Sequence, residues 1–342
     1  MKILFLLTVV VVAGVAMAFT QTKTVAIGPH EPIDLKGRLR IDGEKPEPAH
    51  GHLFLVGVSE VRVSLLQKLV LSLDPEITLQ DAPLPTEVHI TDQRDKDAIL
   101  ESKKIAAAAA YTLLGRPVRI TGGGAFVNMV DSEGPASGRL KGGDRITLLN
   151  GRLVDTSLDV TRIIGSSPPG TRLEIGFRRG NLPFTISLRT TTPLKGDRLH
   201  TSRIGVGLTT PRLRIGLPRR ISLDTAKVVG PSAGLAFALA VYDAESSVDL
   251  LRGRYIVATG ALTLEGEVLR VGGVRQKAIS TQSKEYDLLI TPRGNVDEAV
   301  EAIRDVCDPE AECVRVLGVD SVAQAVEYLK LGSRDLEPKL AN

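Results

Sequence analysis

The chain has 342 residues and a mass of 36.6 kDa, a length that corresponds to two or three domains. Hydrophobic residues make up 43% and charged residues 24%, close to the globular average, which excludes wholesale disorder and collagen-like or coiled-coil character. A net charge of +3, 4% aromatic residues and no tryptophan argue against a nucleic-acid partner, because single strands bind in basic grooves lined with aromatic rings.

Histidine is scarce, and its positions argue against a zinc site and a local serine triad. His50 and His52 flank one glycine, but no third ligand follows at helical or turn spacing and no H-E-x-x-H motif occurs. No histidine follows His200, so a serine near the C-terminus would have to take its base from far away. The chain also lacks the G-x-x-x-x-G-K-[ST] motif of Walker-type ATP sites, and we expect no metal and no cofactor.

The chain begins with an apolar run. Residues Ile3 to Phe19 carry no charge, and as a helix they would span roughly 25 Å, slightly less than the ~30 Å core of a bilayer. The Ala-Met-Ala tripeptide before Phe19 also fits the cleavage site of a secretory signal, but the run exceeds the usual signal length and Phe19 is bulky. We predict that residues 1–20 form an uncleaved single-pass anchor in the cell membrane, with the catalytic domains extracytoplasmic. A cleaved signal is the alternative.

Two cysteines, Cys307 and Cys313, are separated by five residues of turn-like composition. An exported chain folds in an oxidising compartment, where an even pair of cysteines is more often a disulfide than two thiols. We therefore expect a bond between them. The alternative is that they are two small hydrophobic residues.

Residues 21–115 are expected to form a mixed α/β region. Four prolines among polar residues indicate an exposed stalk over residues 21–50. A strand is predicted from Leu53 to Val63, a short helix from Leu65 to Leu73, and a longer helix from Lys96 to Leu114. No recognisable chemistry lies in this region, so its role stays open.

From Val118 onward, short apolar segments separated by glycines predict a series of short strands. Residues 134–151, G-P-A-S-G-R-L-K-G-G-D-R-I-T-L-L-N-G, predict a short helix, a Gly-Gly-Asp turn into a strand and an Asn-Gly hairpin. This stretch resembles a bacterial PDZ domain over residues 116–192, which implies peptide recognition by strand addition. A purely structural PDZ-like module is the alternative. The resemblance places the loop that binds a peptide carboxylate at Gly122, Gly123, Gly124, Ala125 and Phe126.

From Ile204 onward, short strands alternate with helices, which is typical of an α/β domain. Within it, Gly-Pro-Ser-Ala-Gly places Ser232 between small residues at a helix start. Small neighbours let a substrate backbone approach, and free N–H donors at a helix N-terminus can hold an oxyanion. Taken alone, the motif also fits an ordinary N-cap serine.

A Gly-Gly step leads into a second predicted helix, whose first turn carries Lys277. Ala278 and Ile279 beside it favour a partly desolvated amine, and a desolvated lysine can lose its proton and act as a base. A solvated surface lysine is the alternative. What favours a functional site is the co-occurrence of Gly-Pro-Ser-Ala-Gly, Thr259-Gly260 and Gly-Gly-x-x-x-Lys in this order.

That combination resembles the proteolytic domain of Lon proteases over residues 200–335. The resemblance implies a Ser-Lys dyad in which Ser232 is the nucleophile, Lys277 the general base and Thr259 a supporting hydroxyl, and we expect the backbone N–H groups of Ser232 and Ala233 to hold the oxyanion. The whole chain looks like the membrane-anchored bacterial proteins that combine a PDZ and a Lon domain. It departs from the family in Val229, where many Lon enzymes have an acidic residue, and in lacking the ATPase module.

Together these segments predict a multidomain chain of α/β and β class. Its parts are an N-terminal apolar anchor helix, a mixed α/β N-terminal region, a PDZ-like β-rich module and a C-terminal Lon-type α+β proteolytic domain. We expect an ATP-independent serine endopeptidase that acts on peptides or unfolded proteins and contacts the lipid bilayer through residues 3–19. The alternative is a catalytically silent peptide-binding adaptor or assembly scaffold. The sequence leaves open the natural substrate and whether copies of the chain form a homo-oligomer.

Overall fold

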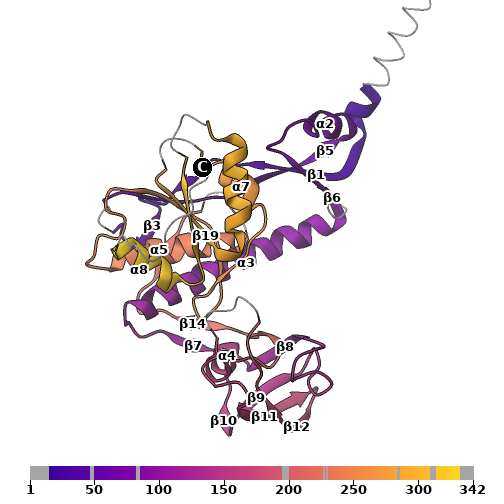
Figure 1. Cartoon of the computed structure of the whole chain (residues 1–342), viewed down its shortest axis with the longest axis vertical. Helices are drawn as coiled ribbons and strands as arrows, with labels where there is room; N and C mark the ends of the chain where they lie inside the picture. Colours follow the sequence, from indigo (N-terminus) through magenta and orange to yellow (C-terminus); the bar gives the residue numbers. More distant parts are fainter. Residues whose placement is uncertain are drawn as a thin grey trace, which may run out of the picture. The chain divides into compact units, whose positions relative to one another are not determined.

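The chain is described by a computed structural model over residues 15–46, 50–81, 85–194, 200–225, 228, 230–282, 286–308 and 313–331. It divides into two compact units (Figure 1). Residues 1–115 and 219–342 together form the first unit, and residues 116–218 form the second. The second unit is therefore an insertion in the sequence of the first, and the first is built from two segments far apart along the chain.

A five-stranded sheet forms the centre of the first unit, in the order β2-β4-β16-β19-β20. Four of these strands are parallel, and the short edge strand β2 is antiparallel to β4. Every residue of β19 is buried, as expected for a parallel strand covered on both faces. The strands are β2 (Ile33–Asp34), β4 (His52–Leu55), β16 (Tyr255–Ala258), β19 (Leu288–Pro292) and β20 (Arg315–Val319).

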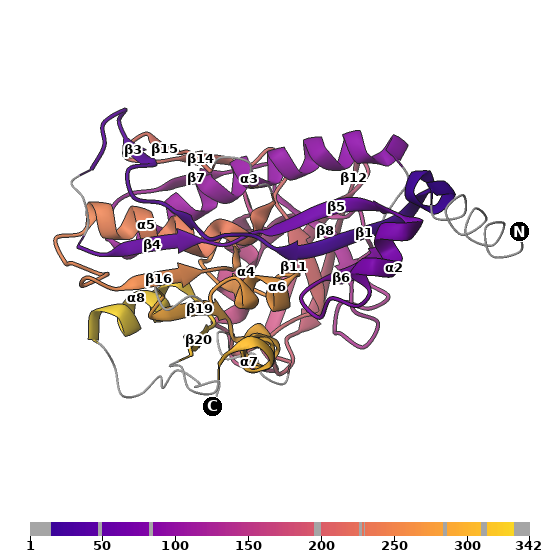
Figure 2. The same ribbon diagram turned by 90° about the horizontal axis from the view of Figure 1, so that it is seen from above.

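Helices cover both faces of this sheet (Figure 2). On one face, α6 and α7 pack on alternate strand residues such as Phe54, Val257 and Leu289. On the other face, α5 packs on β4 and β16, α8 packs on β20, and α3 packs on α5. The helices are α3 (Pro85–Leu113), α5 (Gly234–Glu245), α6 (Val274–Ile279), α7 (Val296–Val306) and α8 (Val322–Leu331), with the 3-10 turns η1 (Pro231–Ala233) and η2 (Arg293–Asn295).

A second sheet in the same unit has the order β5-β1-β6 and is antiparallel. It consists of β1 (Gln21–Pro29), β5 (Val58–Ser64) and β6 (Thr78–Asp81), and α2 (Leu65–Leu71) follows β5 directly. The structure thus differs from the predicted stalk over residues 21–50, because β1 has alternating buried positions and pairs on both sides. Two small pairs complete the unit: β3 (Leu39–Ile41) with β15 (Ile221–Leu223), and β17 (Ala261–Leu262) with β18 (Val268–Leu269).

The second unit is β-rich, with a sheet in the order β12-β11-β9-β8-β13, and β10 pairs with β9. The single helix among its described residues, α4 (Ser157–Gly165), starts at a capping box formed by Thr156 and Asp159. The strands are β7 (Arg119–Thr121), β8 (Ala125–Val130), β9 (Arg145–Leu149), β10 (Arg152–Leu153), β11 (Arg172–Arg179), β12 (Leu182–Arg189), β13 (Val206–Thr209) and β14 (Arg214–Gly216), the last of which pairs with β7.

Most of the apolar run from Ile3 to Phe19 lies outside the described residues, which begin at Val15. Within the part of the chain that the structure describes, no helix is both long and apolar enough to cross a membrane.

The Gly-Gly-Asp signature of the second unit has a clear physical role. Asp144 is buried and accepts a fork of two hydrogen bonds from Arg179, at 2.7 Å from Nε and 2.8 Å from Nη2. It also accepts a bond of 2.8 Å from the backbone N–H of Lys141. Burial alone would raise the pKa of this carboxyl, but the bonds from Arg179 and Lys141 outweigh burial and hold the pKa below its usual range. Asp144 therefore ties the turn before β9 to β11.

We predict that Asp144→Asn lowers the free energy of unfolding of the second unit by about 2 to 3 kcal/mol, because it removes charge-assisted bonds from a buried position. Urea denaturation of the full chain measures the change. Glu133→Gln is the matched control, since this exposed carboxylate lies in the same unit, and it should change stability by less than about 0.5 kcal/mol. Equal stabilities of the two variants would contradict this role of Asp144.

Candidate active site

Ser232 lies in a tight turn at the start of α5. Pro231, Ser232 and Ala233 form η1, and α5 follows without a break. The turn is entered through Gly230 at φ 84°, a left-handed conformation in which a side chain would be strained. Ser232 is half-buried, so its hydroxyl lies between the core and the solvent.

The turn is bonded to the chain segment at the carboxyl end of β16. The carbonyl of Ser232 accepts hydrogen bonds from the N–H of Gly260 at 2.7 Å and from Oγ1 of Thr259 at 3.2 Å. In return, the N–H of Leu235 donates to the carbonyl of Gly260 at 3.0 Å. A further bond of 3.1 Å runs from Oγ of Ser102, on α3, to the carbonyl of Pro231. These four bonds hold the serine backbone in one position.

Close packing explains the second glycine of the motif. A Cβ atom on Gly234 would lie 3.1 Å from Cγ of Leu262, 3.1 Å from Oγ of Ser102 and 3.3 Å from the carbonyl oxygen of Gly260. A larger residue at this position would therefore push the turn away from both α3 and β17. The Gly-Pro-Ser-Ala-Gly sequence is in this way a requirement of local geometry.

Lys277 lies in α6 and is only 3% exposed. Removal from water lowers the pKa of Lys277 to about 8, although the carboxylate of Glu298 opposes the shift. With this pKa, roughly one lysine in ten is neutral at pH 7, compared with about one in three thousand for an ordinary side chain. The buried amine is therefore able to accept a proton near neutral pH.

The Gly-Gly step positions α6. Gly273 has φ 65°, and a Cβ on it would lie 2.8 Å from Cγ1 of Val58, a residue of the N-terminal segment. Val271, which directly precedes the two glycines, is bonded to the side chain of Asn295. That side chain accepts from the N–H of Val271 at 3.0 Å and donates to its carbonyl at 3.2 Å. The same amide donates to Glu298 at 3.3 Å, which keeps this carboxylate at the start of α7.

The structure brings Thr259 into contact with the serine turn, where its hydroxyl supports the backbone of Ser232. Among the described residues, no hydrogen bond joins Oγ of Ser232 to Nζ of Lys277. Catalytic hydrogen bonds are often long before a substrate binds, so the pairing of Ser232 with Lys277 stays a prediction. Val229, next to the turn, lies outside the described residues.

The assignment of the backbone N–H groups of Ser232 and Ala233 to an oxyanion stays a prediction. The next two N–H groups, of Gly234 and Leu235, are already bonded to the carbonyls of Pro231 and Gly260. The donors available to an oxyanion must therefore lie earlier in the turn or come from another segment.

Three supporting residues were missed by the sequence analysis: Ser102, Asn295 and Glu298. Each acts through a contact between segments that are distant in the sequence or through a loop conformation, and none lies in a motif. No signal in a single sequence would have found them.

In the second unit, the structure differs from the predicted peptide-binding loop. Strand β8 lies between β9 and β13, and Phe126 pairs with Arg145 on one side and Thr209 on the other. The N–H groups of Gly123 and Gly124 donate to backbone carbonyls at 2.8 Å and 2.9 Å. The loop that includes Gly122 and Ala125 therefore offers no free strand edge.

Strand β13 forms one edge of this sheet and β12 the other, and a cavity of about 520 Å³ lies beside β13. Val206 and Leu208 of β13 line the cavity, together with Val160 and Ile164 of α4. At one end of it, Nη1 of Arg203 donates to Asp131 at 2.6 Å. An apolar groove beside an open strand edge is the geometry that accepts an extended peptide as an added strand.

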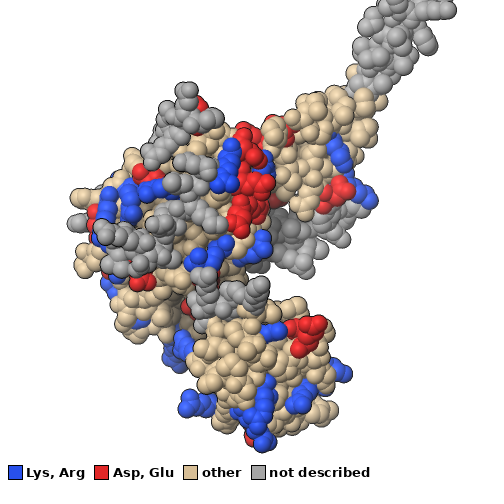
Figure 3. Space-filling model, viewed as in Figure 1, with Lys and Arg blue, Asp and Glu red and all other residues tan. Residues whose placement is uncertain are grey.

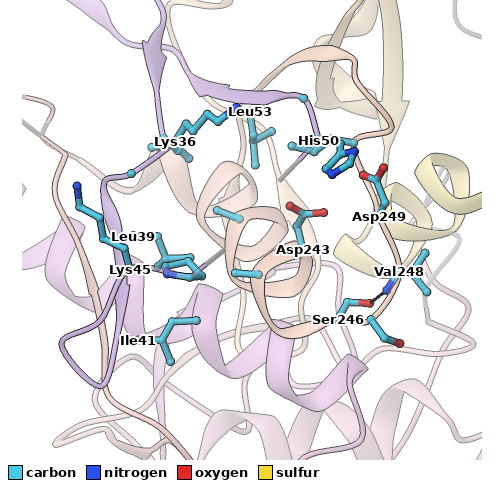
Figure 4. A pocket seen from close by; sticks show the side chains of 18 of the residues that line it. Lys36, Leu39, Ile41, Lys45, His50, Leu53, Asp243, Ser246, Val248 and Asp249 are labelled. Atoms are coloured by element: carbon cyan, nitrogen blue, oxygen red, sulfur yellow. Dashed lines mark hydrogen bonds between the residues drawn. The ribbon is translucent and has the colours of Figure 1, made fainter. Parts of the chain in front are cut away.

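Another cavity, of about 630 Å³, lies in the first unit near the C-terminal end of α5 (Figure 4). It is lined by Asp243, whose pKa is raised by burial, and by Lys36 and His50 from the N-terminal segment. Ser232 lies at the opposite end of this 12-residue helix, roughly 18 Å away along its axis. This cavity is therefore separate from the serine turn.

Cys307, at the end of α7, and Cys313, before β20, are joined by a disulfide with Cα atoms 6.0 Å apart. Both pack against the hydrophobic cluster of α6 and α7. The loop between them is short, so the bond contributes no more than about 3 kcal/mol to stability.

Comparison with known protein families finds a match within each unit. Residues 225–329 match the family described as the Lon protease (S16) C-terminal proteolytic domain, and residues 106–190 match the PDZ domain. The chain therefore contains a serine peptidase domain of the Lon type and a PDZ domain.

Among its relatives, the chain is 38% identical to Lon protease 1 of Herpetosiphon aurantiacus over 102 residues, which are 29% of this chain and 11% of the relative. It is 40% identical to the peroxisomal Lon protease homolog 2 of Eremothecium gossypii over 78 residues, which are 22% of this chain and 7% of the relative. The similarity thus spans about a tenth of the length of these relatives.

Of the solved structures, the PDZ domain of an SdrC-like protein from Listeria monocytogenes is 27% identical to this chain. The match covers 26% of this chain and 92% of that domain, with a TM-score of 0.24.

Burial of Lys277 predicts a cost in stability that depends on pH. Its pKa is about 8 in the folded chain and near 10.5 when unfolded, so the unfolded chain binds more protons between these values and stability rises with pH across that window. Below pH 8 the full cost of about 3 kcal/mol is present. Lys277→Met should therefore raise the free energy of unfolding at pH 7 by up to about 3 kcal/mol, and the gain should nearly vanish by about pH 10.

Urea denaturation at the two pH values tests this prediction. Lys104→Met, which removes an exposed lysine, is the control and should show no such pH dependence. A Lys277→Met protein that is no more stable than the natural chain at pH 7 would show that the ammonium group is solvated or well compensated in the folded state.

Proposed function

We propose that this chain is an ATP-independent serine endopeptidase that cleaves peptides or unfolded proteins with a dyad of Ser232 and Lys277. The observation that carries the proposal is a buried lysine with a pKa of about 8 in the same unit as a serine held on a rigid, glycine-flanked turn. A purely structural lysine would not need to be desolvated at a cost in stability. The Lon-type peptidase domain over residues 225–329 supports the same reading.

In the proposed mechanism, the neutral amine of Lys277 takes the proton of the Ser232 hydroxyl while Oγ attacks the carbonyl carbon of the scissile peptide bond. Backbone N–H groups near the turn stabilise the oxyanion that forms. The lysine ammonium then gives its proton to the leaving amine, which departs and leaves an acyl-serine. Water, deprotonated by the same amine, attacks this ester, and the second product leaves as Lys277 returns the proton to Oγ of Ser232.

The groove between β13 and α4 is proposed to present substrates to this site. An extended peptide would pair with the open edge of β13 and place apolar side chains against Val160 and Ile164. Such binding selects unfolded or terminal segments, because only an extended backbone can add to a strand.

We further propose that the apolar run over residues 3–19 anchors the chain in a membrane, with both units outside the cytoplasm. The disulfide between Cys307 and Cys313 supports this location, since such bonds persist in oxidising compartments. Sequencing of the N-terminus of the mature protein, together with protease accessibility in intact cells, tests this topology. A mature chain that begins at Phe19 would refute the anchor.

One observation favours a second function, that of a peptide-binding adaptor without activity. Ser232 and Lys277 are not hydrogen-bonded in the described structure, whereas the groove beside β13 is already formed. The adaptor would bind unfolded chains and leave them intact.

The decisive experiment measures cleavage of casein by the natural chain, Ser232→Ala and Lys277→Arg, with and without ATP. Both variants should lose nearly all activity, because the first lacks the nucleophile and a guanidinium cannot give up its proton at neutral pH. ATP should have no effect. Ser247→Ala and Lys104→Arg are the matched controls, since both residues are exposed and lie outside the turn and α6, and they should keep full activity.

The pH dependence gives an independent measurement. The value of kcat/KM should rise from pH 7 and level off above an apparent pKa of about 8, as Lys277 deprotonates. A flat profile in a protein that stays folded would mean that another group is the base. Activity that survives in Ser232→Ala would remove the serine from the mechanism, and intact casein in every sample would favour the adaptor.

A further inference from the structure

The short helix α2 exposes an apolar stripe. Leu65 and Leu69 lie four residues apart on one face of α2, and Leu73 follows in the turn directly after the C-cap, Ser72. Their exposed fractions are 44%, 61% and 84%, and no residue of α2 is buried. The helix is nevertheless well defined, because Ser64 and Gln67 form a capping box at its start. The helix packs on β1 and β5, whereas the stripe of Leu65, Leu69 and Leu73 is left uncovered by the described part of the chain.

The stripe lies beside the end of the apolar run of the N-terminus. The N–H of Leu65 donates to the carbonyl of Thr20 at 2.9 Å, and Gln21 pairs with Ser64. Phe19, the last residue of the run, is 82% exposed. The first turn of α2 therefore lies next to the point where the apolar run ends.

Charges of both signs border this surface. From Val61 to Leu73 the chain contains Arg62 and Lys68 and no acidic residue, but Asp74 and Glu76 follow, and Oδ1 of Asp81 lies 4.0 Å from Nζ of Lys68. Nζ of Lys68 donates to Oγ1 of Thr24 at 2.8 Å, so this lysine turns toward β1. In Figure 3, the surface over α2 shows uncharged atoms. An apolar helix face beside the end of an apolar run is suited to lie in the interface of a membrane.

We propose that the stripe of Leu65, Leu69 and Leu73 inserts into the headgroup boundary of the bilayer in which the apolar run is anchored. The proposal rests on the anchored topology of the proposed function. With the run alone, the chain would be held at one point and free to tilt. With α2 as a second, adjacent contact, β1 and β5 are held at a fixed angle to the membrane surface, because both strands are bonded directly to these elements.

The chain contains no tryptophan, so a single introduced indole reports its own surroundings. We would prepare the full chain as Leu69→Trp and bind it to vesicles of phosphatidylcholine with a minority of phosphatidylserine. The emission of this indole should shift to the blue on addition of vesicles and should be mostly lost when the acyl chains carry bromine. Leu153→Trp, at an exposed leucine of β10, is the control and should show neither effect.

Quenching of Leu69→Trp to the same small extent as Leu153→Trp would overturn the proposal, whether or not the chain floats with the vesicles. Flotation without quenching would leave the anchor intact and refute only the contact of α2. A blue shift that appears without vesicles and grows with protein concentration would assign the stripe to a second copy of the chain. The triple variant Leu65→Gln, Leu69→Gln, Leu73→Gln should keep its activity on soluble casein, which verifies folding, and should bind vesicles more weakly than the natural chain.

Discussion

Removal of the Lys277 amine from water is the constraint on which the first unit depends. An ammonium group in a closed core lowers stability by about 3 kcal/mol at neutral pH, and the packing around it must offset that cost. The hydrophobic cluster beside it joins α6 and α7 to one face of the central sheet. Glu298 stabilises the charged form and thus keeps the pKa from falling further. The burial of Lys277 thus balances an amine that is neutral in part near pH 7 against the stability of the fold.

This packing requires the N-terminal segment. Strand β4 pairs in parallel with β16. The residues after the carboxyl end of β16 are hydrogen-bonded to the serine turn. Ser102 holds the carbonyl of Pro231, and Val58 closes on the glycine that opens α6. Residues 21–115 therefore complete the peptidase unit, although the Lon-type family match begins only at residue 225. A chain cut down to residues 200–335 would lose a central strand and the bond from Ser102 that supports the turn of Ser232.

The inserted unit is stabilised in a different way. Its core is made by alternate residues of a twisted sheet and by α4, and its rigidity at the Gly-Gly-Asp turn comes from the fork between Arg179 and Asp144. The groove belongs to β13, a strand contributed by the last residues of the insertion. The same segment that leads the chain back to the first unit thus also forms the edge to which a peptide can pair.

The sequence by itself determined the features that rest on local chemistry. Only small residues fit around Ser232, and two cysteines six positions apart are close enough to be joined by a disulfide. The helix capped at Ser64 is likewise set by neighbouring residues, and it begins at Leu65 as predicted. These features depend on residues that are close in the sequence, so a motif or a spacing is sufficient to predict them.

Tertiary structure decided everything that depends on pairing between distant segments. The prolines of residues 21–50 predict a stalk, yet Gln21–Pro29 is a strand, because it pairs with β5 and β6. Strand β8, which begins in the predicted loop of Gly122–Phe126, is paired on both sides, whereas β13 ends the sheet, since strand order is set by which chain segments meet. The pKa of Lys277 also depends on tertiary structure. Its neighbours in the sequence predict some desolvation, but the extent of that desolvation depends on how α6 packs against α7 and the sheet.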